Sequence, residues 1–260
     1  MSEKIQYSAS DGVATITLNN PARKNAFTAQ MLDDCQAAFR RAATDDEARV
    51  IVLTGAGDAF CTGGDVATMG GEVTAVDTKQ HLWESMQGIP RLVERIDKPV
   101  IAMVNGDAIG GGMDVALMCD MRIASEKARF SEAYVRLGLV PGDGGAWFLP
   151  RLTGMPKALE LLLTGDFIDA AEAARVGIVN RTVPHETLAE TTYGLARRIA
   201  SRPPLAVRMT KRLAYQGLHS DLAGAMDAAS SHVAILQQSA DHKEAVQAFR
   251  EKRAGRFAGR

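Results

Sequence analysis

Three consecutive glycines, Gly110 to Gly112, separate an apolar run from a segment with helical spacing, and Asp114 lies just inside that segment. Glycine-rich turns that lead into helices often bind phosphate groups. Here the residues from Gly110 read GGGMDV, which lacks the third small residue of a dinucleotide-binding fingerprint, and no Gly-Lys-Ser or Gly-Lys-Thr sequence of a P-loop occurs. The sequence therefore argues against a nucleotide-phosphate site at these glycines.

A second glycine-rich loop, TGAGDAFCTGGD, follows another apolar segment and contains Gly64 near its end. Two such loops could direct backbone N–H groups at one oxygen that becomes negative during a reaction, as an oxyanion hole does. Gly64 and Gly111 are the candidate donors, because a glycine has no Cβ to keep a substrate away from its amide. The alternative is that these glycines only permit positive φ angles in tight turns.

The histidines and cysteines do not indicate metal or nucleophile chemistry. No two histidines have metal-ligand spacing, and the adjacent residues His219–Asp221 are not a catalytic triad, whose members come from distant positions. Cys35, Cys61 and Cys119 are odd in number and form no CxxC pair. We expect no metal, no serine nucleophile and no disulfide, but reduced and mostly buried thiols.

The composition limits the partners of the protein. Of its 260 residues, 46% are hydrophobic, enough for a large core in one compact body. The 30 basic and 31 acidic side chains leave a formal charge of -1, so no nucleic-acid or membrane partner is expected. No segment has the length and apolar character of a signal peptide or of the ~18 residues that span a bilayer. A cytoplasmic protein is the expectation.

Strands that alternate with helices must position the glycine loops. The last residues before each glycine loop belong to apolar runs that are typical of buried strands. Strands are expected at 13–18, 50–53, 99–104, 121–125 and 128–131. Helices are expected from Thr28 to about Ala42, over a segment that includes Leu82 to Ile96, and from the triple glycine toward Cys119.

From about residue 155 the pattern becomes almost entirely helical. Asp169, followed three residues later by Glu172, is typical of a helix capping box. Amphipathic helices are expected over 157–165, 186–201, 204–217 and 221–253, with Pro203-Pro204 at a helix start. We therefore divide the chain into an α/β core, residues 1–200, and a helical C-terminal part, residues 201–260.

Three motifs resemble the enoyl-CoA hydratase/isomerase, or crotonase, superfamily. They are AFCTGGD at 59–65, KPVIAMVNGDAIGGGMDVALMCD at 98–120 and LGLVPGDGGAWFLPRLTG at 137–154, and NNPARKNAF at 19–27 and FREKR at 249–253 extend the likeness over nearly the whole chain. The resemblance implies an α/β fold, the crotonase (ClpP-like) spiral of repeated ββα units, in which the helical residues 201–260 mediate trimerisation. It also implies a homotrimer, or a hexamer made from two trimers.

The resemblance gives the glycine loops a role. In the family, the amides at the positions of Gly64 and Gly111 bind the thioester oxygen of an acyl-coenzyme A and stabilise the enolate that forms. Coenzyme A is then part of the substrate rather than a separate cofactor. The family holds it near the positions of Ala22, Arg23 and Lys24 and, from a neighbouring subunit, Lys252. Without the resemblance, these charges are ordinary solvated side chains.

The acids depart from the pattern of the family's hydratases, which hold a water between two glutamates. The first position is Asp114 here, and the second is Tyr134, because FSEAY at 130–134 aligns Glu132 with an earlier residue of that segment. Hydration needs one group to deprotonate water and an acid to protonate the α-carbon. Tyrosine, with a reference pKa of about 10, is a poor base. Loss of one glutamate is therefore expected to impair hydration.

Asp143, in PGDGG, is the substitute acid. Its position matches an acid of the family's dienoyl-CoA isomerases, which also have aspartate at the position of Asp114 but keep a glutamate where Tyr134 stands. In an apolar pocket Asp143 would have a raised pKa and could move a proton from one carbon to another. The residues alone leave open that Asp114 caps a helix and that Asp143 only serves a turn. Tyr134 is expected to form a pocket wall with its hydroxyl bonded to an acid.

These observations favour an acyl-CoA enzyme that stabilises an enolate at Gly64 and Gly111, with Asp143, Asp114 and Tyr134 as the catalytic candidates. Double-bond isomerisation is slightly preferred over hydration or dehydration. The third interpretation is a CoA-thioester-binding or assembly protein without catalysis. Trp147, Phe148, Met113 and the segment from Met69 to Trp83 could line the acyl site, although apolar residues at helical spacing are more often part of a core.

Overall fold

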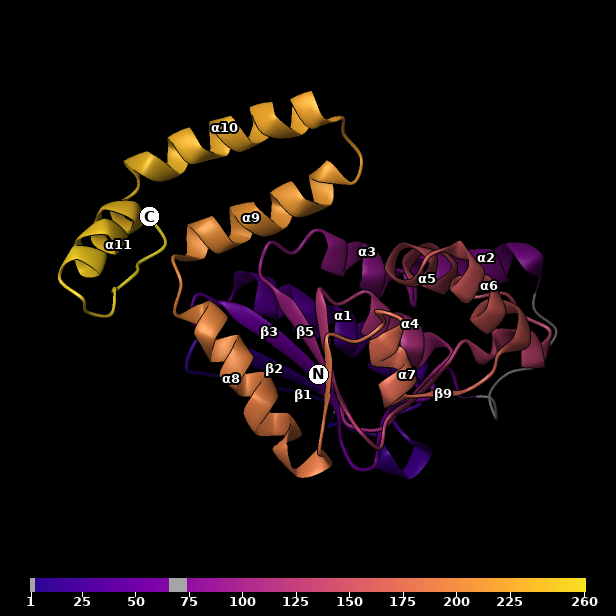
Figure 1. The fold of residues 1–260 in the computed structure, drawn as a ribbon. Helices are drawn as coiled ribbons and strands as arrows, with labels where there is room; N and C mark the ends of the chain where they lie inside the picture. Colours follow the sequence, from indigo (N-terminus) through magenta and orange to yellow (C-terminus); the bar gives the residue numbers. More distant parts are fainter. Residues whose placement is uncertain (1–2, 66–73) are drawn as a thin grey trace.

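The computed structural model describes residues 3–65 and 74–260, and its centre is a six-stranded sheet (Figure 1). The strand order is β1-β2-β3-β5-β7-β10. β1 and β2 form an antiparallel pair, and the other neighbours are parallel. The strands are β1 (Ile5–Ser10), β2 (Val13–Leu18), β3 (Val50–Gly55), β5 (Val100–Val104), β7 (Met121–Ser125) and β10 (Arg181–Val183).

A second sheet contains the short strands that follow the long ones in the chain. Its order is β4-β6-β8-β9, with β8 and β9 antiparallel and the other pairs parallel. The strands are β4 (Ala59–Cys61), β6 (Asp107–Ile109), β8 (Arg129–Ser131) and β9 (Ile168–Asp169). The pairs β3–β4, β5–β6 and β7–β8 therefore each place one strand in each sheet. This repetition is the ββα spiral that the resemblance implies.

Helices cover both faces of the large sheet (Figure 1). The α-helices are α1 (Ala29–Thr44), α2 (Ala75–Glu84), α3 (Gly88–Glu94), α4 (Gly111–Leu117), α5 (Gly145–Thr153), α6 (Met155–Thr164), α7 (Ala170–Arg175), α8 (Leu188–Ala200), α9 (Pro204–Gly217), α10 (Leu222–Gln238) and α11 (Ala240–Arg250). Short 3₁₀ helices occur at η1 (Pro21–Arg23), η3 (Ala133–Leu137) and η4 (His185–Thr187). The predicted start at Thr28 is confirmed, because its side chain caps α1 by accepting the Met31 N–H.

Both faces of the large sheet are buried, which explains why its strands are apolar without alternation. In β3, Val50 and Val52 pack in a cluster with residues of α8, whereas Ile51 and Leu53 face the main core, to which α1 contributes. Successive strand residues point to opposite faces, so an apolar run of four supplies both layers. The three cysteines, Cys35, Cys61 and Cys119, are buried and free, as predicted.

Two segments that were each predicted as one helix form two helices in the structure. The predicted helices were therefore too long. The helix predicted to carry Leu82 to Ile96 is interrupted at Ser85, whose φ of -93° and ψ of -87° lie outside the helical region. The helix predicted over 221–253 is interrupted at Ser239, which has extended dihedral angles and caps α11 by accepting the His242 N–H. Serine is common at helix starts because its hydroxyl oxygen accepts a hydrogen bond from a backbone N–H of the first turn, which has no acceptor within the helix.

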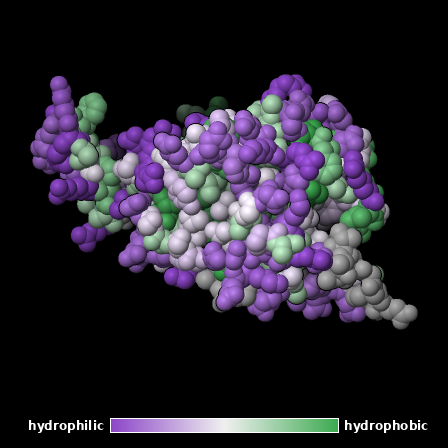
Figure 2. Space-filling view, turned by 90° about the horizontal axis from the view of Figure 1, so that it is seen from below, coloured by the Kyte–Doolittle hydropathy of each residue, from purple (hydrophilic) through white to green (hydrophobic). Residues whose placement is uncertain are grey.

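The C-terminal helices α9, α10 and α11 extend away from the sheets, with α11 and the C-terminus farthest from α5 and α2 (Figure 1). α9 is held to the core by Asp120, which accepts a hydrogen bond from Tyr215 at 2.8 Å and pairs with Lys211 at 2.7 Å. On the projecting part, hydrophobic atoms are exposed among hydrophilic ones (Figure 2). Of the described helices, none is long and apolar enough to cross a membrane.

Candidate active site

The consecutive glycines Gly110, Gly111 and Gly112 each have a different structural role. Gly110 has a φ of 52° and a ψ of -124°, which suits glycine best, and it makes the turn from β6 into α4. A Cβ on Gly112 would lie 2.0 Å from the backbone oxygen of Cys61, so only glycine lets α4 pack against β4. A Cβ on Gly111 would instead point at Tyr134 and Asp143 and approach the Met86 methyl group at 2.8 Å. Gly111 therefore faces the candidate acids.

The two glycine loops meet beside Gly111. A Cβ on Gly63 would lie 3.0 Å from the Gly111 nitrogen, and Gly64 forms a β-bridge with Phe27. Phe27 donates to the Gly63 oxygen and accepts from Asp65, which leaves the Gly64 N–H outside this bridge. Within residues 3–65 and 74–260, neither the Gly64 nor the Gly111 N–H donates to a protein acceptor. The structure thus brings the loop that contains Gly64 against Gly111, and both amides lack a protein acceptor among the described residues.

Asp114 and Asp143 are joined by the hydroxyl of Tyr134. The hydroxyl lies 2.6 Å from Asp114 Oδ2 and 2.9 Å from Asp143 Oδ2. Asp114 comes from α4 and Tyr134 from η3, while Asp143 precedes the glycine turn into α5. The predicted contact between Tyr134 and an acid is confirmed, and the hydroxyl contacts two acids rather than one.

Glu132, which was not predicted as a site residue, belongs to the same cluster as Asp114, Tyr134 and Asp143. It follows β8 directly and is 1% exposed. A Cβ on Gly145 would lie 2.3 Å from Asp114 Oδ1 and 2.6 and 2.7 Å from the Glu132 carboxyl oxygens. The sheet explains this placement, because β6 and β8 are parallel neighbours with Ile109 opposite Ser131. Residues that follow these two strands must therefore lie side by side.

Burial dominates the electrostatics of the cluster. It raises the pKa of Asp143, against the lowering effect of the Tyr134 hydrogen bond. Burial also raises the pKa of Asp114 to about 7, again opposed by Tyr134, while the charge of Asp143 adds to the rise. Burial and then the nearby charges of Asp114 and Asp143 raise the pKa of Tyr134, so its phenol stays a neutral donor.

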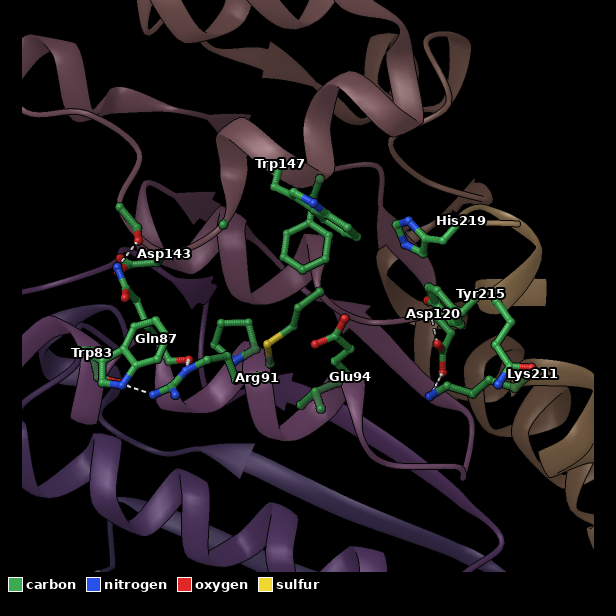
Figure 3. A pocket seen from close by; sticks show the side chains of 17 residues that line it. Trp83, Gln87, Arg91, Glu94, Asp120, Asp143, Trp147, Lys211, Tyr215 and His219 are labelled. Carbon is green, nitrogen blue, oxygen red and sulfur yellow. Dashed lines mark hydrogen bonds and ion pairs between the residues drawn. The ribbon is translucent and has the colours of Figure 1, made fainter. Parts of the chain in front are cut away.

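A cavity of about 630 Å³ opens beside Asp143 (Figure 3). The aromatic side chains of Trp83, Trp147 and Phe148 form an apolar part of the cavity wall. The side-chain amide of Gln87 holds the loop of Asp143 in place by donating a hydrogen bond to the Gly142 oxygen at 2.7 Å. In Figure 3, Asp143 and Tyr215 lie toward opposite ends of the cavity. Met113 is fully buried in the core and does not line the cavity, so of its two alternatives the structure shows the core position. Met69 lies outside the described residues.

The predicted coenzyme A contacts are only partly brought together. Ala22 and Arg23 belong to η1 with Lys24 at its C-cap, and Arg23 forms an ion pair of 2.6 Å with Asp65, next to Gly64. Lys24 lies 3.8 Å from the exposed Asp58. Lys252 lies two residues beyond the end of α11, which lies at the opposite end of the chain's fold from α5 (Figure 1). One chain therefore does not bring Lys252 to the site.

The site residues do not form a recognisable metal centre. In the described part of the chain, no group of three or more histidine, cysteine, aspartate and glutamate side chains is arranged to hold a metal ion. The cluster of Glu132, Asp114 and Asp143 is instead arranged around one tyrosine hydroxyl and one glycine.

Comparison with known proteins identifies the family of the chain. The profile of the Enoyl-CoA hydratase/isomerase family matches residues 8–260. A probable enoyl-CoA hydratase of Rhodobacter capsulatus is 39% identical over 98% of each chain, and the 1,2-epoxyphenylacetyl-CoA isomerase of Escherichia coli is 35% identical over 100% of each. The crystal structure of an enoyl-CoA hydratase from Bacillus anthracis superimposes with a TM-score of 0.94 at 34% identity, over 99% of this chain and 100% of that one. The fold is thus the crotonase fold, and the chain belongs to the enoyl-CoA hydratase/isomerase family.

Proposed function

We propose that this enzyme moves a proton on the acyl group of a coenzyme A thioester, with Asp143 as the catalytic base. The observation that carries the proposal is the position of Asp143, which lines the cavity and also faces Gly111, with its Oδ2 3.2 Å from a Cβ built there. A base next to the thioester carbonyl can remove a proton whose loss produces an enolate. Its raised pKa brings it closer to that of the carbon acid and so improves proton transfer.

The Gly64 and Gly111 N–H groups are the proposed oxyanion hole. The approach of Gly63 to Gly111 supports this role, because it places the two loops in contact next to Asp143, which Gly111 faces. Two amides fixed at the oxygen would stabilise the enolate without reorganisation, and one such donor is worth about 3–4 kcal/mol in comparable enzymes. Asp114 would share protons with Asp143 through Tyr134.

Double-bond isomerisation is the preferred reaction. Asp143 alone could take a proton from one carbon and return it to another, whereas hydration also needs a group that activates water. Tyr134, at the position of the second hydratase glutamate, has a raised pKa and cannot serve as that base near neutral pH. Hydration or dehydration is the second candidate, favoured by the names of relatives such as the crotonyl-CoA hydratase of Syntrophomonas wolfei and by the additional acid Glu132.

A direct assay separates these reactions from the third interpretation, a thioester binder without catalysis. The purified protein is incubated in D₂O with crotonyl-CoA and, separately, with a 3-enoyl-CoA. Absorbance of the conjugated thioester and mass spectrometry then follow the reaction. Isomerisation converts the 3-enoyl thioester into a conjugated one without adding water. Hydration of crotonyl-CoA adds the mass of water, and absence of both turnover and hydrogen exchange across a panel of acyl groups would refute the proposal.

The phosphates of coenzyme A are proposed to bind near Ala22, Arg23 and Lys24. Because Arg23 is about half exposed and pairs with Asp65, the neighbour of Gly64, Arg23→Ala should raise KM for an acyl-CoA about tenfold and change kcat little. The KM for the same acyl group on pantetheine, which lacks the nucleotide phosphates, should not change. Arg175→Ala removes an equally ion-paired exposed arginine and serves as the control. Equal KM changes for both thioesters would contradict the assignment.

We propose further that the chain assembles into a trimer, or a hexamer made from two trimers, in which Lys252 reaches the site of a neighbouring subunit. The exposed apolar side chains of the C-terminal helices support this, since single chains rarely leave so many in water. They include Leu222, Met226, Val233, Ile235 and Phe249. Sedimentation equilibrium tests the proposal: a mass of one 27.8 kDa chain at micromolar concentration would contradict it.

A further inference from the structure

Glu132 and Asp114 form a buried carboxyl pair, and the preferred reaction gives Glu132 no role of its own. Both residues are 1% exposed. Asp114 Oδ1 and both Glu132 oxygens converge on the position that a Cβ on Gly145 would occupy, at 2.3, 2.6 and 2.7 Å from it. Gly145 therefore leaves the space in which the two carboxyl groups meet.

No donor of the described residues satisfies the facing oxygens. Asp114 Oδ1, Glu132 Oε1 and Glu132 Oε2 are buried and accept no hydrogen bond from an N–H or O–H group. The titratable groups that face the pair are Tyr134 from η3 and Asp143 from the loop before α5, and neither is a cation. Two ionised carboxylates at this place would repel each other with little solvent screening. One proton between them turns the repulsion into a charge-assisted hydrogen bond.

We propose that Glu132 keeps its proton at neutral pH and donates it to Asp114 Oδ1, which makes Glu132 a positioning residue for the proton chemistry at Asp143. Burial and the charge of Asp114 raise the pKa of Glu132 well above its ordinary value, in agreement with a neutral acid. The shared proton rests on the contacts of the pair alone. Its effect on catalysis rests on the proposed function of Asp143.

The connection to Asp143 follows from the single proton of the Tyr134 hydroxyl. That hydroxyl contacts Asp114 Oδ2 at 2.6 Å and Asp143 Oδ2 at 2.9 Å, but it can donate to only one of them at a time. When Tyr134 donates to ionised Asp143, Asp114 must be protonated to donate to the tyrosine oxygen. The chain Glu132–Asp114–Tyr134–Asp143 then holds one negative charge and two carboxyl protons.

This arrangement conserves the protons during the reaction. Ionised Asp143 takes the proton from one substrate carbon, the electron pair of that C–H bond enters the enolate, and Asp143 returns the proton to another carbon. The protons between Glu132, Asp114 and Tyr134 shift within their hydrogen bonds, and none is consumed. Glu132 contributes a donor that stabilises the one negative charge wherever it lies along the chain.

Two variants of similar volume test the proposal. Glu132→Gln keeps a donor for Asp114 Oδ1, whereas Glu132→Met keeps the approximate volume without a donor. Without this donor the one negative charge that the cluster shares is less stabilised and ionisation becomes harder, so Glu132→Met should move the acidic limb of the kcat/KM profile about one to two units to higher pH. Glu132→Gln should keep the wild-type limb. Equal profiles for the two variants, or a loss of activity in Glu132→Gln, would overturn the proposal.

Infrared difference spectroscopy tests the shared proton even if the protein turns over no acyl-CoA. The spectrum of the wild type minus that of Glu132→Gln at pH 7 should show the C=O stretch of a protonated carboxyl, shifted in D₂O. The matched control is Glu190→Gln, which replaces an exposed glutamate and should remove only carboxylate bands. If Glu132→Gln also removes only carboxylate bands, Glu132 is ionised and the proposal is wrong, whatever the result for the proposed function.

Discussion

Replacing Asp143 with asparagine should lower kcat for proton transfer on an enoyl-CoA by about 10²–10⁴-fold. Asparagine keeps the size of the side chain and can still bond Tyr134, which donates to Asp143 Oδ2 at 2.9 Å. It cannot accept a proton from carbon. The effect should therefore appear in kcat, with thioester affinity within about twofold of wild type, because the proposed oxyanion donors Gly64 and Gly111 remain.

Deuterium exchange followed by mass spectrometry measures this effect, and calorimetric titration with a saturated acyl-CoA measures the affinity. The fold of the variant should be preserved. Burial raises the pKa of Asp143 in the folded protein, so its ionisation there costs free energy. The free energy of unfolding of the wild type, relative to that of Asp143→Asn, should therefore fall as the pH rises from about 4 through the folded pKa of Asp143. The control is Asp166→Asn, whose side chain is 68% exposed. Wild-type exchange in Asp143→Asn would exclude Asp143 as the base.

Replacing Gly112 with alanine should destabilise the protein by about 3 kcal/mol or more. The new Cβ would lie 2.0 Å from the Cys61 oxygen and 2.5 Å from its carbonyl carbon, which are backbone atoms of β4. Side-chain rotation cannot relieve this overlap, so α4 must move away from β4. The same movement would displace Gly111 and Asp114, and the proposed activity should fall together with the stability.

Urea unfolding monitored by circular dichroism measures the change in the free energy of unfolding. Gly194→Ala is the matched control, because Gly194 lies within α8 and a Cβ there meets nothing within 4 Å. In that helix alanine should be neutral or stabilising, by up to about 1 kcal/mol. If Gly112→Ala is as stable as Gly194→Ala, α4 does not depend on its close packing against β4.

Much of the fold could be predicted because buried parallel strands are apolar on both faces. The expected strand at 13–18 coincides with β2, and that at 121–125 with β7. β1 was not predicted, although IQYSAS alternates apolar and polar residues as an edge strand does. The helix breaks at Ser85 and Ser239 were missed because apolar spacing continues across them. Where such a segment bends depends on tertiary packing, which periodicity does not contain.

Some residues of the candidate site could be predicted from the sequence and others could not, for a physical reason. Gly64, Gly111 and Asp143 belong to segments with clear turn chemistry, and the structure places Asp143 opposite Gly111 and Gly63, the neighbour of Gly64, against Gly111. Glu132 was missed because its importance comes from the register between β6 and β8, which pairs Ile109 with Ser131. Sequence spacing alone does not contain that register.

A crystal structure with an unreactive acyl-CoA thioester would test the proposed oxyanion hole and catalytic base together. We expect the thioester oxygen to lie about 2.7–3.1 Å from the Gly64 and Gly111 nitrogens. We also expect the acyl chain to enter the cavity of Trp83, Trp147 and Phe148, with a carbon of its first few positions facing Asp143. A thioester oxygen bound away from both amides, or an acyl chain that does not reach Asp143, would contradict these assignments.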